Sequence, residues 1–462
     1  MDQDADMDFG GPAQVFGGQE DTRAPDTNRR LLDLVFVQDC TGSQGSYITS
    51  ATKNIREICA HIYESGRLQE QGDLRVGLVA FRDHPPQDHT YVTRNFGFTS
   101  DVGKVHEQLS GLYASGGGDG PEAVTAALVD ALNMDWRQDA ARMVVLIADA
   151  PPHGIGEFGD GFDEGSPDGF DPLQVARQFA NRGITLFFVA CEPALSGYLY
   201  ATDFYKAITT ITSGLMLPLT TADLLAHAIV GSVLENLDME RLVLEVGQAV
   251  AERVQGNHQS VDDVARELHE RLLLRNESTK KVVIESIYRE TPESASNVEA
   301  FCNADTLKQA RPFLQKVSGS RFTEKYAQMR QRGYTPYSHT YVPATPPRSP
   351  TLSRSLSPRA TPSSPPRKVV QDFASYGVAS GTSVFGTSVA PSPFSLAGGK
   401  AAFGSIRNTK PRGGGFDDDD DDDDDDNFGP GKQRVQLKDG SVTLEQARRI
   451  AIQSVMRNGG GM

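Results

Sequence analysis

Apolar residues in the first half of the chain alternate between short apolar runs and longer segments with helical spacing. The runs at 31–38, 142–148 and 184–190 are almost continuously apolar, which is typical of parallel strands covered on both faces. Segments whose apolar residues recur every three or four positions separate most of the runs. The predicted strands cover 31–38, 74–81, 91–98, 142–148, 184–190 and 214–219, and the predicted helices cover 46–65, 101–112, 121–134, 172–182 and 221–234.

This alternation predicts a doubly wound α/β domain over residues 29–235, with a mostly parallel six-stranded sheet. The segment 91–98 follows its predecessor without an intervening helix, so we expect it to be an antiparallel edge strand paired with 74–81. We expect the strand order 3-2-1-4-5-6, in which the first and fourth strands are neighbours at the point where the order reverses.

The rest of the chain is predicted to differ from this domain. Residues 236–332 combine helical spacing with mixed charge, which predicts a mostly helical accessory region with Ser260 as one N-cap. The run at 281–288 is a candidate for an additional strand. Residues 1–28 and 333–440 hold few large apolar residues, so we expect both segments to be disordered.

A short amphipathic helix is predicted near the C-terminus, at 441–458. Thr443 and Gln446 stand in capping-box positions, and apolar residues recur with helical spacing up to Gly459. A helix of this length is marginal in isolation, so we expect it to fold against a partner.

Charge and composition limit the classes of function. The formal charge is −16, but ten of the negative charges belong to the aspartates at 417–426, which leaves −6 for the rest. An acidic chain of this kind is not expected to bind nucleic acid. The N-terminal residues do not resemble a signal peptide, no apolar run approaches the ~18 residues of a membrane span, and the four cysteines are widely scattered. We therefore expect a soluble, cytoplasmic protein.

Oxygen-bearing side chains collect at the predicted carboxyl ends of the strands. Asp39, Thr41 and Ser43 follow the first strand at intervals of two residues. Asp149 directly follows the fourth strand, and Asp119 lies in the glycine-rich segment SGGGDGPEAV. Because ligands collect where the strand order reverses, these three loops are expected to converge. Carboxylates and hydroxyls are the ligands that hard divalent cations prefer.

These motifs together resemble the von Willebrand factor A domain and its metal-ion-dependent adhesion site. The first motif of that family is Asp-x-Ser-x-Ser, which corresponds here to Asp39, Thr41 and Ser43, and Asp149 matches the third motif. The second motif differs, because GGGDGPEA offers Asp119 where threonine is common. The resemblance covers 31–235 and is greatest to intracellular domains of this family, including those linked to alpha-type protein kinases.

The resemblance implies a metal site that binds a partner without breaking bonds. It implies Mg²⁺ or Mn²⁺ as the ion, held by Asp39, Thr41, Ser43, Asp119 and Asp149, with an acidic side chain of a protein partner completing the coordination. A cation with few anionic protein ligands still attracts a further carboxylate.

Simpler interpretations exist for each motif. Asp39 alone would be read as a helix N-cap, and the glycine-rich loop could hold a phosphate, although it lacks the residues of a P-loop. His153 is interpreted as a histidine of a surface loop. The acidic residues that follow are interpreted as a solvated flap near the metal face, and they are Asp160, Asp163, Glu164, Asp168 and Asp171.

The predicted linker carries motifs for further partners. The segments PATPPR (343–348) and PSSPPR (362–367) fit a polyproline ligand of SH3-type grooves. Five serine or threonine residues precede proline and are candidate phosphorylation sites, where added charge would offset nearby arginines. These are Thr345, Ser349, Ser357, Thr361 and Ser364.

Three functions compete. The first is a non-catalytic, metal-dependent interaction module with a regulated tail that serves as a scaffold. The second is a protein kinase, or a protein that acts with one, but residues 236–462 contain no obvious nucleotide-binding glycine loop. The third is a hydrolase that uses the metal to activate water, and no neighbouring general base is evident.

Overall fold

The computed structural model describes residues 30–333 and 433–459. Residues 30–327 and 433–459 belong to one compact unit, and the following description concerns that unit. The segments 1–28 and most of 333–440, with the proline motifs, the phosphorylation candidates and the aspartate run, lie outside the described residues.

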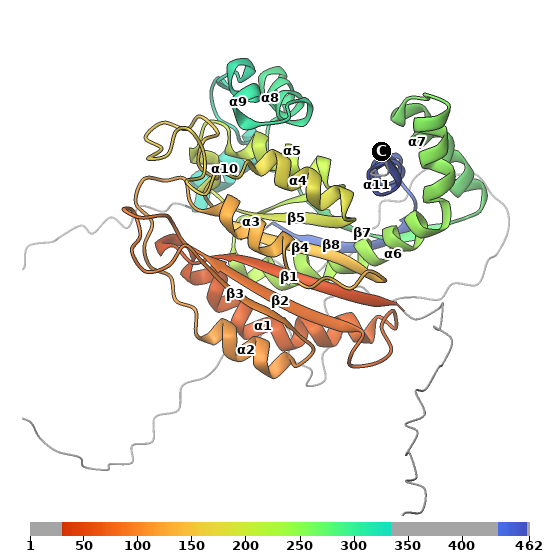
Figure 1. The fold of residues 1–462 in the computed structure, drawn as a ribbon, viewed down its shortest axis with the longest axis horizontal. Helices are drawn as coiled ribbons and strands as arrows, with labels where there is room; N and C mark the ends of the chain where they lie inside the picture. Colours follow the sequence, from red (N-terminus) through yellow and green to blue (C-terminus); the bar gives the residue numbers. More distant parts are fainter. Residues whose placement is uncertain (1–29, 334–432, 460–462) are drawn as a thin grey trace, which may run out of the picture. The chain divides into compact units, whose positions relative to one another are not determined.

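A six-stranded sheet forms the centre of the unit (Figure 1). Its order is β3-β2-β1-β4-β5-β6, and every pairing is parallel except that of β3 with β2. The predicted fold class, strand order and antiparallel edge strand are therefore confirmed. The strands are β1 (Leu31–Asp39), β2 (Leu74–Phe81), β3 (Thr93–Thr99), β4 (Ala140–Ala148), β5 (Ile184–Cys191) and β6 (Met216–Leu219).

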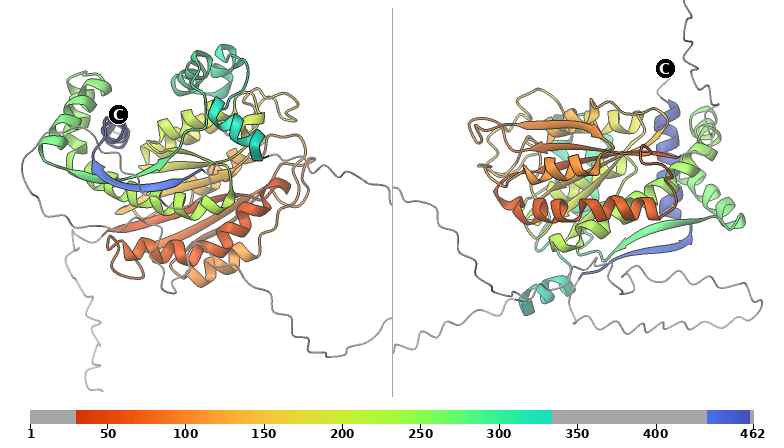
Figure 2. Two further views of the ribbon diagram at one scale, coloured as in Figure 1. Left: turned by 180° about the vertical axis from the view of Figure 1, so that it is seen from behind. Right: turned by 90° about the horizontal axis from the view of Figure 1, so that it is seen from below.

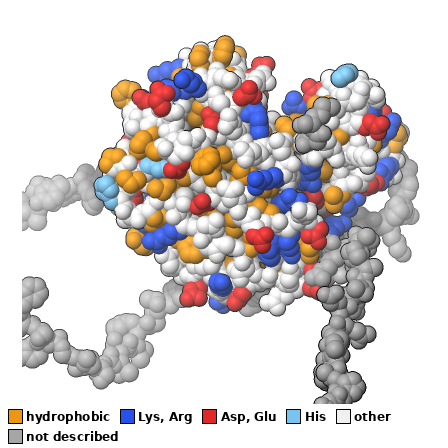
Figure 3. All heavy atoms as spheres, in the orientation of Figure 1, with side chains coloured by type: hydrophobic (Ala, Val, Ile, Leu, Met, Phe, Trp, Pro, Cys, Tyr) orange, Lys and Arg blue, Asp and Glu red, His pale blue; other side chains and the backbone are white. Residues whose placement is uncertain are grey.

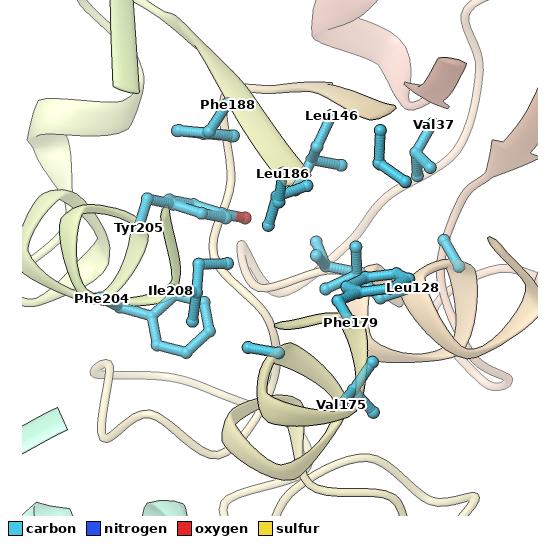
Figure 4. Packing of buried hydrophobic residues seen from close by; sticks show 14 of the residues in the cluster. Val37, Leu128, Leu146, Val175, Phe179, Leu186, Phe188, Phe204, Tyr205 and Ile208 are labelled. Carbon is cyan, nitrogen blue, oxygen red and sulfur yellow. The ribbon is translucent and has the colours of Figure 1, made fainter. Parts of the chain in front are cut away.

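Helices cover both faces of the sheet (Figure 1). On one face lie α1 (Gly45–Glu64), α2 (Val102–Ser110) and α6 (Leu225–Ala251), and on the other lie α3 (Val124–Leu132), α4 (Pro172–Asn181) and α5 (Ala201–Ile211). Because alternate side chains of a strand point to opposite faces, Val35 and Val37 belong to the core under α3 to α5. Phe36 faces Ile55 and Ile229 on the other side. Figure 4 shows the first of these cores, where Tyr205 stacks on Phe188 at 3.6 Å between ring centroids.

Several element boundaries differ from the prediction by a few residues, and two of the differences bear on the domain boundary and the site. α6 runs through the expected domain boundary at residue 235, because its apolar positions continue to Val250 and Ala251. α3 begins at Val124 instead of 121, because the backbone N–H of Glu122 donates to the carbonyl of Pro151 (2.9 Å) and pins this stretch outside the helix.

The remaining residues add helices and a two-stranded sheet. The longer elements are α7 (Val261–Leu274), β7 (Ser278–Ile284), α8 (Pro292–Asn303), α9 (Leu307–Ala310), α10 (Glu324–Gly333), β8 (Val435–Ser441) and α11 (Leu444–Gly459). Short 3₁₀ segments occur at Gly42–Gln44, Leu195–Gly197, Ala222–Leu224 and Arg311–Phe313, and a π-helical turn at Glu252–Gly256. No helix among the described residues has the length and apolar character to cross a bilayer.

Strand β8 corrects the prediction that 333–440 is disordered throughout. β8 pairs antiparallel with β7 beside α6, with Leu437 opposite Val282 (Figure 2). The side chains of Leu437 and Val282 lie over Gly231 of α6. The partner strand of β8 lies about 150 residues earlier in the sequence, so no local sequence pattern predicts the pairing.

The C-terminal helix α11 finds its packing partner in the same chain. Ala447, Ile450 and Ala451 are buried against α6 and α7. The predicted capping box is present, since the Gln446 N–H donates to Thr443 Oγ1 (3.2 Å) and the Thr443 N–H donates to Gln446 Oε1 (3.0 Å). The helix therefore has a sequence-encoded start and an intramolecular apolar surface.

A buried ion pair anchors α11 to the sheet domain. The carboxylate of Glu235, which is fully buried, accepts from the guanidinium of Arg449 and from the N–H of Val282 (2.8 Å). Arg449 Nε also donates to the carbonyl of Ser213 (2.8 Å). These bonds connect α6, α11, β7 and the turn before β6.

Arg449→Ala is expected to lower the free energy of unfolding by about 3 kcal/mol, because it leaves the buried Glu235 carboxylate without its cationic partner. Urea unfolding followed by circular dichroism measures this change. The matched control is Arg448→Ala, since Arg448 pairs with Asp262 at an exposed position, where loss of a pair costs less than about 1 kcal/mol. Equal losses in the two variants would contradict the assigned role of the buried pair.

Candidate metal centre

Two of the five predicted ligands, Asp39 and Asp149, lie at the ends of neighbouring strands at the same edge of the sheet. Asp39 is the last residue of β1, Asp149 directly follows β4, and these strands pair in register up to Gln38 and Ile147. The Asp39 side chain is 0% exposed and that of Asp149 is also buried. The expected convergence of the two loops is therefore present in the structure.

The turn after β1 satisfies only one oxygen of Asp39. The N–H and the hydroxyl of Thr41 both donate to Asp39 Oδ1, at 2.8 and 2.7 Å. The other oxygen, Oδ2, is buried and has no hydrogen-bond partner among the described residues. Neither the 3₁₀ turn after Thr41 nor α1 receives a cap from Asp39, so the helix-cap interpretation does not account for this residue.

The glycine-rich loop before α3 lies directly on this turn. The Ser115 N–H donates to the carbonyl of Cys40 (3.0 Å), and the Gly42 N–H donates to the carbonyl of Gly116 (3.2 Å). A Cβ at Gly117 would lie 2.6 Å from a carboxylate oxygen of Glu122 and 3.5 Å from Thr41 Cβ. Glycine, with a φ of +84°, is therefore required for the loop to approach the turn.

Glu122 is a site residue that the sequence analysis missed. Its side chain is 5% exposed, and its Oε2 is buried with no partner among the described residues. Burial, followed by the charges of Asp39 and Asp83, raises its pKa to about 10. The sequence does contain a second carboxylate in GGGDGPEA, three residues after Asp119. That position belonged to the helix predicted from residue 121, so Glu122 was not considered as a ligand.

The electrostatics of the site favour a bound cation. Burial, together with the charge of Asp149, raises the pKa of Asp39 to about 7. Asp39 Oδ2 and Glu122 Oε2 are buried and have no hydrogen-bond partner within the described part of the chain, so each would gain an interaction from a divalent ion. An all-oxygen donor set of this kind fits a hard cation such as Mg²⁺ or Mn²⁺.

The other two predicted ligands occupy different surroundings. Ser43 is exposed in the 3₁₀ turn Gly42–Gln44. Asp119 is half-buried, and its Oδ2 accepts from the Gly161 N–H and from Gln87 Nε2 (3.3 Å). One of its oxygens lies within 4.8 Å of ligand atoms of Asp83 and His153. The assignment of both residues to the Asp39 site stays a prediction.

His153 is not the surface histidine that the sequence suggested. Its side chain is 1% exposed, with Nε2 at 2.8 Å from Asp83 Oδ1 and Nδ1 at 2.7 Å from Asp160 Oδ1. These two hydrogen-bonded carboxylates, working against burial, raise its pKa to about 9. The sequence could not show this, because Asp83 follows a different strand.

The acidic flap is likewise only partly solvated. Asp163, Glu164 and Asp168 are exposed as expected. Asp160 is buried and bonded to His153, and Asp171 caps α4 by accepting from the Leu173 N–H (2.9 Å). Hydrogen bonds of Asp160 and Asp171 therefore hold this acidic segment near its two ends.

Fold and site together define a doubly wound α/β domain with an acidic ligand site at the carboxyl ends of its strands. Residues 33–214 match the family model of the von Willebrand factor type A domain. The chain therefore contains a domain of this family, and the resemblance found in the sequence is confirmed.

Two curated relatives share part of this sequence. A putative ariadne-like RING finger protein of Acanthamoeba polyphaga mimivirus is 29% identical over 194 residues, which cover 40% of this chain and 18% of the relative. The alpha-protein kinase vwkA of Dictyostelium discoideum is 29% identical over 160 residues, which cover 34% of this chain and 25% of the kinase. The match thus spans a quarter or less of either relative. The solved pilus adhesin SpaC from Lactobacillus rhamnosus GG aligns with 46% of this chain and 31% of its own, at 12% identity and a TM-score of 0.35.

Metal-free protein is expected to lose stability as the pH rises from about 4 to about 7. The pKa of Asp39 is about 7 in the folded protein against an ordinary value of 3.8, so in this interval the folded state holds a proton that the unfolded state has released. Asp39 alone then lowers the free energy of unfolding by up to about 1.4 kcal/mol per pH unit, and Glu122, whose pKa is raised to about 10, adds a fall of the same sign above its ordinary value of 4.5. Thermal unfolding in EDTA across this interval measures the effect.

Asp39→Asn is the control for this pH dependence. Its Tm should fall less steeply with pH than that of the wild type, because the amide does not titrate. Excess Mg²⁺ near neutral pH should raise the Tm of the wild type and leave that of the variant almost unchanged. Parallel pH profiles of the two proteins would contradict the raised pKa of Asp39.

Proposed function

We propose that this domain is a metal-dependent protein-interaction module that acts without catalysis. The observation that supports it most is the buried Asp39 Oδ2, which lacks a hydrogen-bond partner among the described residues and lies in the field of Asp149. A divalent cation would complete its interactions. The proposed ion is Mg²⁺ or Mn²⁺, and the proposed ligands are Asp39, Thr41, Ser43, Asp119 and Asp149, with Glu122 beside them.

An acidic side chain of a protein partner would supply the remaining ligand. Ser43 is exposed and Asp119 is half-buried, so the proposed ligand set reaches the surface on this side. A cation held by few carboxylates keeps enough positive charge to bind another one. On the face shown in Figure 3, acidic and basic side chains of the described residues are interspersed, which suits a protein partner better than a nucleic acid.

The proposal extends to the segment beyond residue 333, on sequence grounds. Its two P-x-x-P-x-R motifs suit SH3-type partners, and its five proline-directed serines and threonines suit phosphorylation. We place the protein in the cytoplasm, where such partners and kinases operate, as a scaffold or regulator.

Two catalytic alternatives have less support. Kinase activity would rest on the similarity to the alpha-protein kinase, and that similarity covers 25% of the kinase. Hydrolysis would need a general base beside the metal. His153, in the loop after Asp149, has carboxylates on both ring nitrogens, and they raise its pKa to about 9 against the effect of burial, so the ring already holds its proton in the cation-free protein and is unsuited to take another from water.

Asp39→Ala is expected to weaken Mg²⁺ binding at least tenfold, or about 1.4 kcal/mol, because it removes a buried anionic ligand. Calorimetric titration of the full chain with Mg²⁺ measures this loss. The same variant, or EDTA with the wild type, should also release partners in a pull-down while the circular dichroism spectrum stays nearly unchanged.

The matched control is Asp163→Ala, which removes an exposed carboxylate of the flap and should leave ion and partners bound. Partners retained in EDTA would refute the metal-dependent interaction. Phosphate release or protein phosphorylation that is lost in Asp149→Ala would instead support one of the catalytic alternatives.

A further inference from the structure

A second group of ligand-type side chains lies at the same edge of the sheet. Asp83 follows β2, Asp119 precedes α3 and His153 follows β4. One ligand atom from each lies within 4.8 Å of the others. Three loops that are distant in sequence thus bring two carboxylates and an imidazole together.

Each carboxylate of this group has one oxygen held by the protein and one without a partner. Asp83, 0% exposed, accepts from the His84 N–H (2.7 Å) and contacts His153 through Oδ1, while its Oδ2 is buried and unpartnered among the described residues. Asp119 accepts from Gly161 and Gln87 through Oδ2, while its Oδ1 is likewise buried and unpartnered. Bare buried oxygens are costly unless a donor or a cation meets them.

The imidazole of His153 is oriented as metal-binding histidines are. Its Nδ1 contacts Asp160 Oδ1 (2.7 Å), and Asp160 is itself fixed by the N–H groups of Gly154 (2.7 Å) and Phe162 (2.9 Å). The Phe162 ring meets the imidazole edge-on at 4.8 Å between centroids. A carboxylate on the far nitrogen directs Nε2 toward the other ligands. A cation bound there would replace the proton that Nε2 now shares with Asp83 Oδ1 (2.8 Å).

We propose that Asp83, Asp119 and His153 bind a second divalent cation beside the one proposed at Asp39, with Asp119 shared between the two ligand sets. The imidazole ligand suits Zn²⁺, Fe²⁺, Ni²⁺ or Cu²⁺, and the two carboxylates also suit Mn²⁺, which can therefore serve as a probe of the site. A cation-free ion pair of His153 with Asp83 and Asp160 is the simpler interpretation, and it leaves Asp83 Oδ2 and Asp119 Oδ1 unexplained.

Such a cation would also fix the flap between residues 154 and 169. The flap contributes Asp160 to His153 and the Gly161 N–H to Asp119, so two of the three ligands are tied to it. The flap also carries Phe158, two residues before Asp160, and this side chain is 96% exposed. The second cation would therefore hold an exposed aromatic side chain in place.

Pulsed EPR of the full chain with bound Mn²⁺ tests the proposal, because only a histidine ligand couples a nitrogen nucleus to the ion. The Asp39 site and the aspartate run at 417–426 offer oxygen alone. Nitrogen coupling is expected in the wild type, in Asp39→Asn and in His84→Gln. It should disappear in His153→Gln and fall at least several-fold in Asp119→Asn.

The variants separate this site from the proposed function. His84→Gln is the matched histidine control, since its ring lies 5.9 Å from that of His153 but outside the proposed ligand set. Asp119→Asn alters a half-buried ligand, so it tests the site even where His153→Gln unfolds the flap. Mn²⁺ bound to the wild type without nitrogen coupling, or coupling that survives His153→Gln, overturns the second site and leaves the Asp39 site standing. Loss of the coupling in Asp39→Asn would show that one cation occupies both ligand sets, which also overturns it.

Discussion

Burial of several carboxylates at the carboxyl ends of adjacent strands is the constraint on which this domain depends. Asp39, Asp83 and Asp149 follow β1, β2 and β4, which are neighbours in the sheet, and Glu122 enters from the loop that lies across them. Burial and their mutual repulsion raise the cost of ionising these groups, as the elevated pKa values of Asp39 and Glu122 show. These carboxylates are held close together by the glycine-rich loop before α3, the turn at Thr41 and the contacts of His153. A bound cation would offset their mutual repulsion, so the arrangement suits cation binding.

The parts of this site that depend on local sequence patterns could be predicted from the sequence. Continuous apolar runs marked the buried strands, and the carboxylates directly after β1 and β4 followed from the strand order, because parallel strands end at one edge. The roles of Glu122 and His153 were not predictable in this way, because each depends on contacts with loops from other strands. A buried histidine and a surface histidine look alike in sequence when one of the carboxylates that binds the ring, here Asp83, lies 70 residues away.

The same distinction explains the C-terminal segment. The capping box of α11 is local and was read correctly, whereas β8 depends on a strand far upstream. Once formed, the segment contacts the sheet domain repeatedly: Gln433 Nε2 donates to the carbonyl of Pro218 (2.6 Å), and Arg457 pairs with Glu240. The predicted phosphorylation sites lie in the sequence between α10 and β8, outside the described residues.

The two proposed cation sites differ in ligand chemistry but share their electrostatics. Asp83 and Asp119 both raise the pKa of Glu122, and Asp83 also raises that of Asp39. A cation among Asp83, Asp119 and His153 would offset those negative charges, so the carboxyls of Asp39 and Glu122 would lose their protons at lower pH. Ionised carboxylates are the form that ligates a metal. Occupation of the second site would then let the first site bind its cation over a wider pH range. Because linkage is reciprocal, a partner that strengthens binding of the first cation would change the affinity for the second cation by the same factor.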